Sequence, residues 1–403
     1  MATQQLRSYK FTTVRMLNYV KPGNGWTVDS VLTVEDLTLT NDQIMSWFNM
    51  RVWGYPDPAP DHQHAPLVRS NSILYWKKQI SFFMPNRMQP WDHIGNSGNP
   101  TRCNGMASLL KTVKRMEARG IGKPSEARDS ISETQFRLMN QVLLDKDASL
   151  IEKYGIPALT KFQFHMISRI DDSTLFFAQH LKPHDIYSDF CLKARLNWAK
   201  NVNEEREAPY QTLIGSMNQE YCIFIALGIW LEASLTAFPW AATSPYVFSF
   251  KNDLRIPEGA TKSKAHAQKI LHMVFNEHDA FAETKLGSHS VRKYASTTVR
   301  NNGATKDEKD IRGRWKSSTR VSDVYDDVEL PFPDAKLAGM LCPGGPIRYS
   351  IVPGSGVTRA FIVDRVVPRI KAKFGGDVAY VFGTALLWVL HSPYFVMMPA
   401  MLG

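Results

Sequence analysis

Six residues of this 403-residue chain have side chains suited to cutting a phosphodiester. They are Arg169, Lys200, His289, Arg292, Trp315 and Tyr325. Four of them fall in the segment from Gly287 to Tyr325, where a His and an Arg stand three residues apart and a Tyr follows a Trp by ten. The set contains cations and donors that could hold a phosphate, groups that could carry protons, and a phenol that could attack phosphorus.

The two arginines of this set provide the strongest chemical argument. His289 and Arg292 lie at i and i+3, so one face of a predicted helix would present both to a single bound group. Arg169 stands more than one hundred residues earlier, in a segment that we also predict to be helical. Two guanidiniums from different elements can clamp the non-bridging oxygens of a phosphate. Such fixed donors stabilise the charge that builds on these oxygens in a pentacoordinate transition state.

Tyr325 is the predicted nucleophile. A phenol, with a reference pKa near 10, is a tolerable leaving group, so a phosphotyrosine link could form and be reversed without an energy cofactor. Lys200 is expected beside the turn of a β-hairpin, where a flexible ammonium could protonate the departing 5′-oxygen. Trp315 offers an indole N–H donor and a large ring for packing. His289 could transfer a proton or hold a phosphate oxygen, and the sequence does not decide between these roles.

Positive charge is concentrated in two parts of the chain. The net charge is +10, and residues 66–125 contain ten Lys or Arg but only two Asp or Glu. Residues 261–320 contain thirteen basic and six acidic residues. Two basic blocks inside foldable stretches predict two surfaces that grip a polyanion.

The first 125 residues are predicted to form a small helical domain. Helical spacing of apolar residues covers 40–54, 69–84 and 103–120; Thr40 or Asn41 caps the first of these helices and Gly54 ends it. The cations that we expect to contact DNA are Arg69, Lys77, Lys78, Lys111, Lys114, Arg115 and Arg119. The segment 121–132, which is rich in Gly, Pro and Ser, is the expected linker.

The second part is predicted to be mainly α with a small β-hairpin. Residues 133–144 and 158–181 have helical patterns. Residues 191–214 are predicted to form the hairpin, with Leu192, Ala194, Leu196 and Trp198 on its buried face. An apolar helix over 215–233 and further helices from 262 to 325 complete the prediction.

Other features limit the class of protein. The apolar content of 44% predicts a packed core, and four scattered cysteines without a CxxC pair argue against a zinc site or a disulfide framework. The apolar stretch 378–390 is too short to span a bilayer. Since the first residues do not read as a signal peptide either, we expect an intracellular protein, nuclear if the source is eukaryotic, without membrane association.

The ordered set of six residues resembles the tyrosine recombinases, a family that includes the phage integrases. The family pattern is Arg, a hairpin Lys, His-x-x-Arg, His or Trp, then Tyr, and all six positions are filled here. Asp172 stands where the family has an acidic residue that braces the first Arg. The segment around the hairpin is similar to recombinases of eukaryotic mobile elements such as cryptons. The chain departs from the family at Arg169, which follows Ile-Ser rather than a Thr-Gly turn.

The resemblance implies an architecture and a set of partners. Residues 1–125 would form the helical core-binding domain that clamps DNA, and 126–345 the α+β catalytic domain. Residues 346–403 would be a C-terminal extension of unknown role, whose 378–390 stretch could dock on a neighbouring subunit or pack in its own chain. The expected partners are double-stranded DNA and three further copies in a tetramer on synapsed DNA, with no cofactor and no metal.

Three other functions remain open at this level. A type IB topoisomerase would use the same chemistry, although it carries a His where this chain has Trp315. A domesticated, non-catalytic DNA-binding protein would need none of the six residues. A metal nuclease could use Asp171 with Asp172, or Asp326 with Asp327, but neighbouring carboxylates in a helix or strand point apart.

Overall fold

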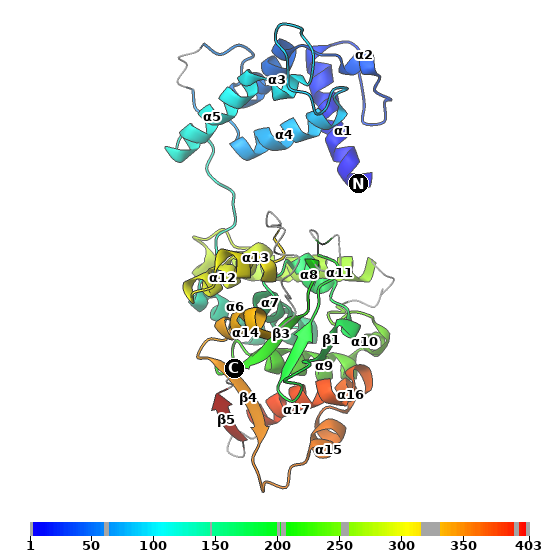
Figure 1. Cartoon of the computed structure of the whole chain (residues 1–403), viewed down its shortest axis with the longest axis vertical. Helices are drawn as coiled ribbons and strands as arrows, with labels where there is room; N and C mark the ends of the chain where they lie inside the picture. Colours follow the sequence, from blue (N-terminus) through cyan, green and yellow to red (C-terminus); the bar gives the residue numbers. More distant parts are fainter. Residues whose placement is uncertain are drawn as a thin grey trace. The chain divides into compact units, whose positions relative to one another are not determined.

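The chain folds into two compact units, Met1–Glu126 and Ala127–Gly403. The structure is a computed structural model (Figure 1), and it describes residues 3–59, 64–145, 147–199, 202, 207–250, 258–315, 331–390 and 395–399. Each unit is built around a hydrophobic core of its own.

The first unit is helical, as the sequence predicts. Its elements are α1 (Thr3–Val20), α2 (Val34–Leu37), α3 (Asn41–Trp53), α4 (Ser70–Phe83), the short η1 (Pro100–Arg102) and α5 (Asn104–Ala118). Thr40 caps α3 through a capping box with Gln43, and Gly54 ends the helix in the left-handed region at φ 92°. Both ends of this helix were predicted from the sequence, because capping depends only on residues within one turn.

The core of the first unit lies between α1, α3, α4 and α5. Its fully buried side chains include Leu17, Phe48, Ile73, Met106 and Val113, which come from these four helices. Since each helix buries one apolar stripe, the opposite faces are left for polar and charged side chains. The face of α5 that remains exposed is the most basic of these.

The second unit combines helices with one antiparallel sheet of order β1-β2-β3-β4-β5. The strands are β1 (Leu181–Pro183), β2 (Cys191–Ala194), β3 (Gln211–Ser216), β4 (Pro346–Ile351) and β5 (Phe395–Pro399). The helices before the basic segment are α6 (Glu133–Asp145), the π-helical turn η2 (Ile151–Gly155), α7 (Ile156–His165), α8 (Ile170–Thr174), η3 (Ala178–His180), α9 (Ile223–Ala237) and α10 (Pro239–Thr243). Those that follow are α11 (Glu258–Glu277), η5 (Asp279–Phe281), α12 (Ser288–Asn301), α13 (Lys306–Arg312), α14 (Pro331–Met340), α15 (Arg359–Phe361), η7 (Ile362–Val366), α16 (Pro368–Phe374) and α17 (Gly376–Leu390). This arrangement confirms the predicted mainly α fold with a small sheet.

The predicted hairpin is present, but its first strand is shorter than expected. β2 and β3 pair antiparallel with Cys191 opposite Ile214, while β2 ends at Ala194. Trp198 was predicted to lie on the buried face; it is instead 61% exposed, because it stands beyond the end of the strand. The apolar helix also begins later than predicted, since Gly215 and Ser216 belong to β3 and α9 starts at Ile223.

The C-terminal segment is part of the second unit rather than an appendage. β4 pairs with β3 through Gly215 and Ile347, and β5 pairs with β4, so the sheet is extended by two strands that the sequence analysis missed. α17 packs against α9, where the rings of Phe224 and Phe382 lie 6.0 Å apart. The apolar stretch 378–390 therefore packs within its own chain. Among the described residues, we find no helix with the length and apolarity needed to cross a bilayer.

Candidate functional site

Arg169 stands at the entry to α8 and not inside a helix, which corrects the prediction. Its backbone is extended (φ −80°, ψ 157°) because the preceding helix, α7, ends at His165 and Ile167 turns the chain through the left-handed region at φ 44°. Asp172, buried in the first turn of α8, accepts a hydrogen bond from the Arg169 amide through Oδ2 at 3.2 Å. The Arg169 side chain is half-buried at this corner. Burial is the main cause that lowers the pKa values of His289 and Arg292, and the nearby charge of Arg169 lowers both further.

Arg292 is the centre of the site. It lies on α12, only 7% exposed, and its Nη2 donates a hydrogen bond to the carbonyl oxygen of Gly313. Its Nη1 lies 3.8 Å from Oδ2 of Asp172 and has no hydrogen-bond partner among the described residues. The guanidinium also lies over the Trp315 ring, 4.3 Å from its centroid. A cation held by a carboxylate, a carbonyl and an aromatic face is oriented before any ligand arrives.

Trp315 reaches Arg292 because the chain turns tightly after α13. The Trp315 amide donates to the carbonyl of Asp310 at 2.9 Å, which folds the ring back over Gly313. A Cβ on Gly313 would lie 1.8 Å from this ring, so the position accepts only glycine while the ring keeps its place. The spacing Gly313–Trp315 is thus required by packing.

His289 lies at the start of α12, one turn before Arg292, and its ring is exposed to solvent. Its pKa is lowered below the ordinary value, first by the protein atoms that crowd the ring and then by the positive charge of Arg292. The lowered pKa favours the neutral imidazole, which can accept a proton at one ring nitrogen and donate one from the other, and this suits proton transfer.

Two further arginines, Arg312 and Arg314, were not predicted as site residues, and they hold the elements of the site together. Arg312 is buried and donates to the carbonyls of His165 (2.9 Å from Nη2) and Thr212 (3.0 Å). It also forms an ion pair with Asp334 at 2.5 Å. This side chain therefore ties the end of α7, strand β3 and α14 to α13. The alternation of Arg312 and Arg314 around Gly313 is the sequence signal that could have identified the pair.

Arg314 occupies the left-handed region at φ 53°, where a non-glycine residue is held only by its surroundings. Its side chain provides these contacts, since Nη1 donates to Oε1 of Gln211 at 2.8 Å and Nη2 to the carbonyl of Met166 at 3.0 Å. Burial lowers the pKa of Arg314 to about 9 and that of Arg292 to about 10. Both guanidiniums therefore remain charged at neutral pH, in surroundings that strengthen their pull on an anion.

The carboxylates of α8 are paired with these cations. Asp172 faces Arg292, and Asp171 forms an ion pair with Lys264 of α11 at 2.9 Å. The metal-nuclease hypothesis for Asp171 and Asp172 is therefore unfavourable, because each carboxylate already neutralises a cation on a different element. Within the described ranges, no group of three His, Cys, Asp or Glu side chains converges as a metal would require.

The site thus brings together four of the six predicted residues. In Figure 1, α8, α12 and α13 lie at the same end of the second unit. They contribute Arg169 with Asp172, His289 with Arg292, and the turn that carries Trp315. Lys200 and Tyr325, like Asp326 and Asp327, lie outside the residues that the structure describes. Many cations of the segment 261–320 were expected on a surface, yet Arg292, Arg312 and Arg314 are buried within this site.

The seven cations of the first unit that were predicted to contact DNA divide into two groups. Arg69 is held in place, with Nη1 donating to the Lys123 carbonyl at 3.0 Å and Nη2 lying 3.4 Å from Glu117. Lys77 is half-buried, and burial lowers its pKa. The exposed members of this predicted set are Lys78 on α4, Lys111, Lys114 and Arg115 on α5, and Arg119 just after it.

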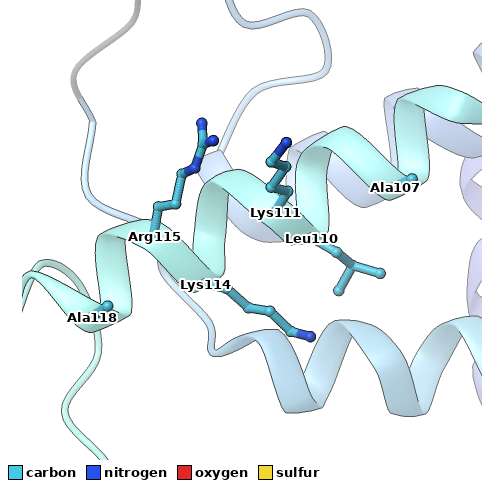
Figure 2. Close-up of a pocket in the computed structure, with 6 residues that line it drawn as sticks. All are labelled: Ala107, Leu110, Lys111, Lys114, Arg115 and Ala118. Atoms are coloured by element: carbon cyan, nitrogen blue, oxygen red, sulfur yellow. The ribbon is translucent and has the colours of Figure 1, made fainter.

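The exposed face of α5 forms a shallow depression of about 420 Å³. It is lined by Ala107, Leu110, Lys111, Lys114, Arg115 and Ala118 (Figure 2). Lys111 and Arg115, one turn apart, point to the same side of the helix in this view. Lys111, Lys114 and Arg115 are side chains of the kind that contact phosphate oxygens.

The described fold is a helical unit followed by a mainly α unit with a small antiparallel sheet and a buried arginine site. No family model and no curated protein matches the sequence. A solved Flpe–Holliday junction complex is similar with a TM-score of 0.42 and 13% identity, over 97% of this chain and 98% of that chain. An FLP recombinase–Holliday junction complex gives 0.41 and 11%, over 96% and 97%.

Proposed function

We propose that this chain is a DNA strand-transfer enzyme of the tyrosine recombinase type. It would cut one strand through attack by Tyr325, form a 3′-phosphotyrosine link and release a 5′-hydroxyl. A 5′-hydroxyl from a partner duplex would then attack the link and restore a phosphodiester. Two such rounds on a synapsed tetramer would exchange both strands, as in recombination of a mobile element.

The observation that carries the proposal is the convergence of Arg169, His289 and Arg292 at one place. Arg169 comes from a segment more than one hundred residues before His289 and Arg292, it interacts with both through its charge, and Arg292 is oriented by Asp172 and Trp315. DNA binding alone does not require a buried guanidinium that is fixed in orientation and whose Nη1 has no hydrogen-bond partner among the described residues, as in Arg292. Fixed cations of this kind hold a phosphate and stabilise the charge of its transition state.

The proposed steps conserve the energy of the phosphodiester. The Tyr325 phenol passes its proton to His289 or to water and bonds to phosphorus, while the bond from phosphorus to the 5′-oxygen breaks. Lys200 would protonate that leaving oxygen, and His289 would hold a non-bridging oxygen or assist proton transfer. One phosphodiester is exchanged for another of similar energy, so no nucleotide cofactor is consumed.

Covalent capture on a nicked suicide duplex tests the proposal. We expect the whole chain, incubated with such duplexes made from DNA that flanks its gene, to form an adduct that survives denaturing electrophoresis. Peptide mapping should place the DNA on Tyr325, and Tyr325→Phe should form none. Tyr75→Phe, an exposed tyrosine of the first unit, is the matched control and should form normal amounts.

The outcomes separate the alternatives. If the unchanged chain binds these duplexes but forms no adduct, the chain is a non-catalytic DNA-binding protein. If Tyr325→Phe leaves adduct formation intact, Tyr325 is not the nucleophile. If adducts form but a single copy only relaxes supercoiled plasmid and never yields recombinants, the protein is a topoisomerase.

The basic face of α5 gives a separate prediction for DNA binding. Replacing Lys111 and Arg115 together by Gln should weaken binding to any duplex and reduce the slope of log K against log[salt] by about 1–2, because roughly 0.9 counterions are released per phosphate contact. Fluorescence anisotropy at several salt concentrations measures this slope. The control replaces Arg7 and Lys123, which already have carboxylate partners, and should leave it nearly unchanged. If the two double variants had equal slopes, α5 would not be part of the DNA interface.

A further inference from the structure

Lys161 is a buried cation for which the proposed chemistry has no use. It is the single Lys or Arg of α7, a helix that is buried along its whole length, and its exposed fraction is only 9%. Among the described residues, its ammonium has no hydrogen-bond or ion-pair partner, and it is not one of the side-chain atoms that are wholly shut off from solvent, so it reaches the space of a cavity. Removing most of the water around an ammonium without supplying a partner is unfavourable. A lysine kept there for packing alone would be better replaced by Met or Leu.

The side chain of Lys161 lines a cavity of about 440 Å³ in the second unit. One wall is apolar, formed by Leu144, Pro157, Ile225 and Ile229. This volume lies within the range of pockets that hold small molecules, roughly 300–1,000 Å³. The cavity therefore combines an unpaired buried cation with an apolar wall that could cover the body of a ligand.

The other charged residues that line the cavity are exposed or partly exposed. Arg137 of α6 forms an ion pair with Glu220, and both side chains are about half exposed. Lys153 of η2 and Asp145 of α6 also line the cavity. Glu220 raises the pKa of Lys161 through space, but burial has the larger effect and lowers this pKa to about 8. No carboxylate of the described residues occupies the place that an anion would take against the ammonium.

We propose that this cavity binds a small amphiphilic monocarboxylate, whose carboxylate pairs with Lys161 and whose apolar body lies against the α7–α9 wall. The cavity favours a small ligand over a macromolecule because it is concave and the side chain of Lys161 is buried in it. A single carboxylate fits the one buried cation of the cavity, whereas a dianion would leave one charge buried without a partner. This site is independent of the DNA chemistry.

Binding of 4-phenylbutyrate to the whole chain tests the proposal, with 4-phenylbutan-1-ol as the uncharged probe of similar shape. Isothermal titration at pH 7 should give saturable binding of the acid, at least about tenfold tighter than the alcohol, since a charge-assisted pair contributes on this scale. Lys161→Met should lose this preference and should be at least as stable to heat, because it removes an unpaired buried charge. Lys153→Met, at the edge of the cavity, should keep most of the preference.

Raising the pH provides a second measurement. Affinity for the acid should fall as the pH passes about 8, where free Lys161 loses its proton, whereas affinity for the alcohol should stay constant. The other titratable groups near Lys161 are Arg137, Lys153, Asp145, Tyr154, Glu220, His165 and Cys222, and Lys161→Met should abolish the pH dependence if Lys161 is its source. Equal binding of acid and alcohol, no binding of either up to about 10 mM, or an unchanged preference in Lys161→Met would each overturn the proposal.

Discussion

We expect Arg292→Lys to reduce covalent strand cleavage by about 10²–10³-fold, which is the usual effect of removing one oriented transition-state donor. Lysine keeps the charge, but it has no planar fork with which to bond the Gly313 carbonyl, face Asp172 and lie over Trp315 at the same time. The lysine ammonium could take other positions. Its positive charge would then no longer be held beside the phosphate oxygens on which negative charge develops.

The rate of adduct formation on the nicked suicide duplex is the measurement, at saturating protein so that binding does not limit it. Arg300→Lys is the matched control, since it makes the same change on the exposed face of the same helix and should react like the unchanged chain. Thermal denaturation should show that the Arg292→Lys chain is folded. A rate within threefold of the unchanged chain would mean that Arg292 is a structural residue and not part of the phosphate site.

We expect Arg312→Met to lower the free energy of unfolding of the second unit by about 3–5 kcal/mol, the cost of breaking a buried ion pair by removing one partner. The side chain of Arg312 is fully buried, and its loss leaves Asp334 charged in the interior and the carbonyls of His165 and Thr212 without their donor. Asp334 would still accept from the Thr212 amide, which compensates only one of its oxygens.

Denaturant unfolding of the whole chain, followed by a tryptophan signal assigned to the second unit, measures this loss. Lys336→Met removes an exposed ion pair with Glu308 on the neighbouring surface and should cost less than about 1 kcal/mol. The double variant Arg312→Met with Asp334→Leu should recover part of the loss, because it removes the uncompensated charge. A loss below about 1 kcal/mol for Arg312→Met would contradict the structural role given to this pair.

The sequence alone was sufficient for features that depend on neighbours within a few residues. The cap at Thr40, the end at Gly54, the helices α3, α4 and α5, and the pairing of β2 with β3 follow from local propensity, side-chain spacing and turn chemistry, whereas α1 (Thr3–Val20) and α2 were not predicted. The spacing of His289 and Arg292 also sufficed to put both on one helix, since an i, i+3 relation is fixed by helix geometry.

Features that depend on distant segments were decided by the tertiary structure. The helical pattern of 158–181 is interrupted at Ile167, so Arg169 stands at a corner where Asp172 and α12 can reach it. β4 and β5 join the sheet because β3 offers an edge more than one hundred residues earlier in the chain, a pairing that no local pattern reveals. Arg312 and Arg314 look like surface cations in the sequence, but they are buried because carbonyls and carboxylates from α7, β3 and α14 surround them. The sequence thus determined which residues could do the chemistry, and packing between distant segments determined which of them are fixed in place to do it.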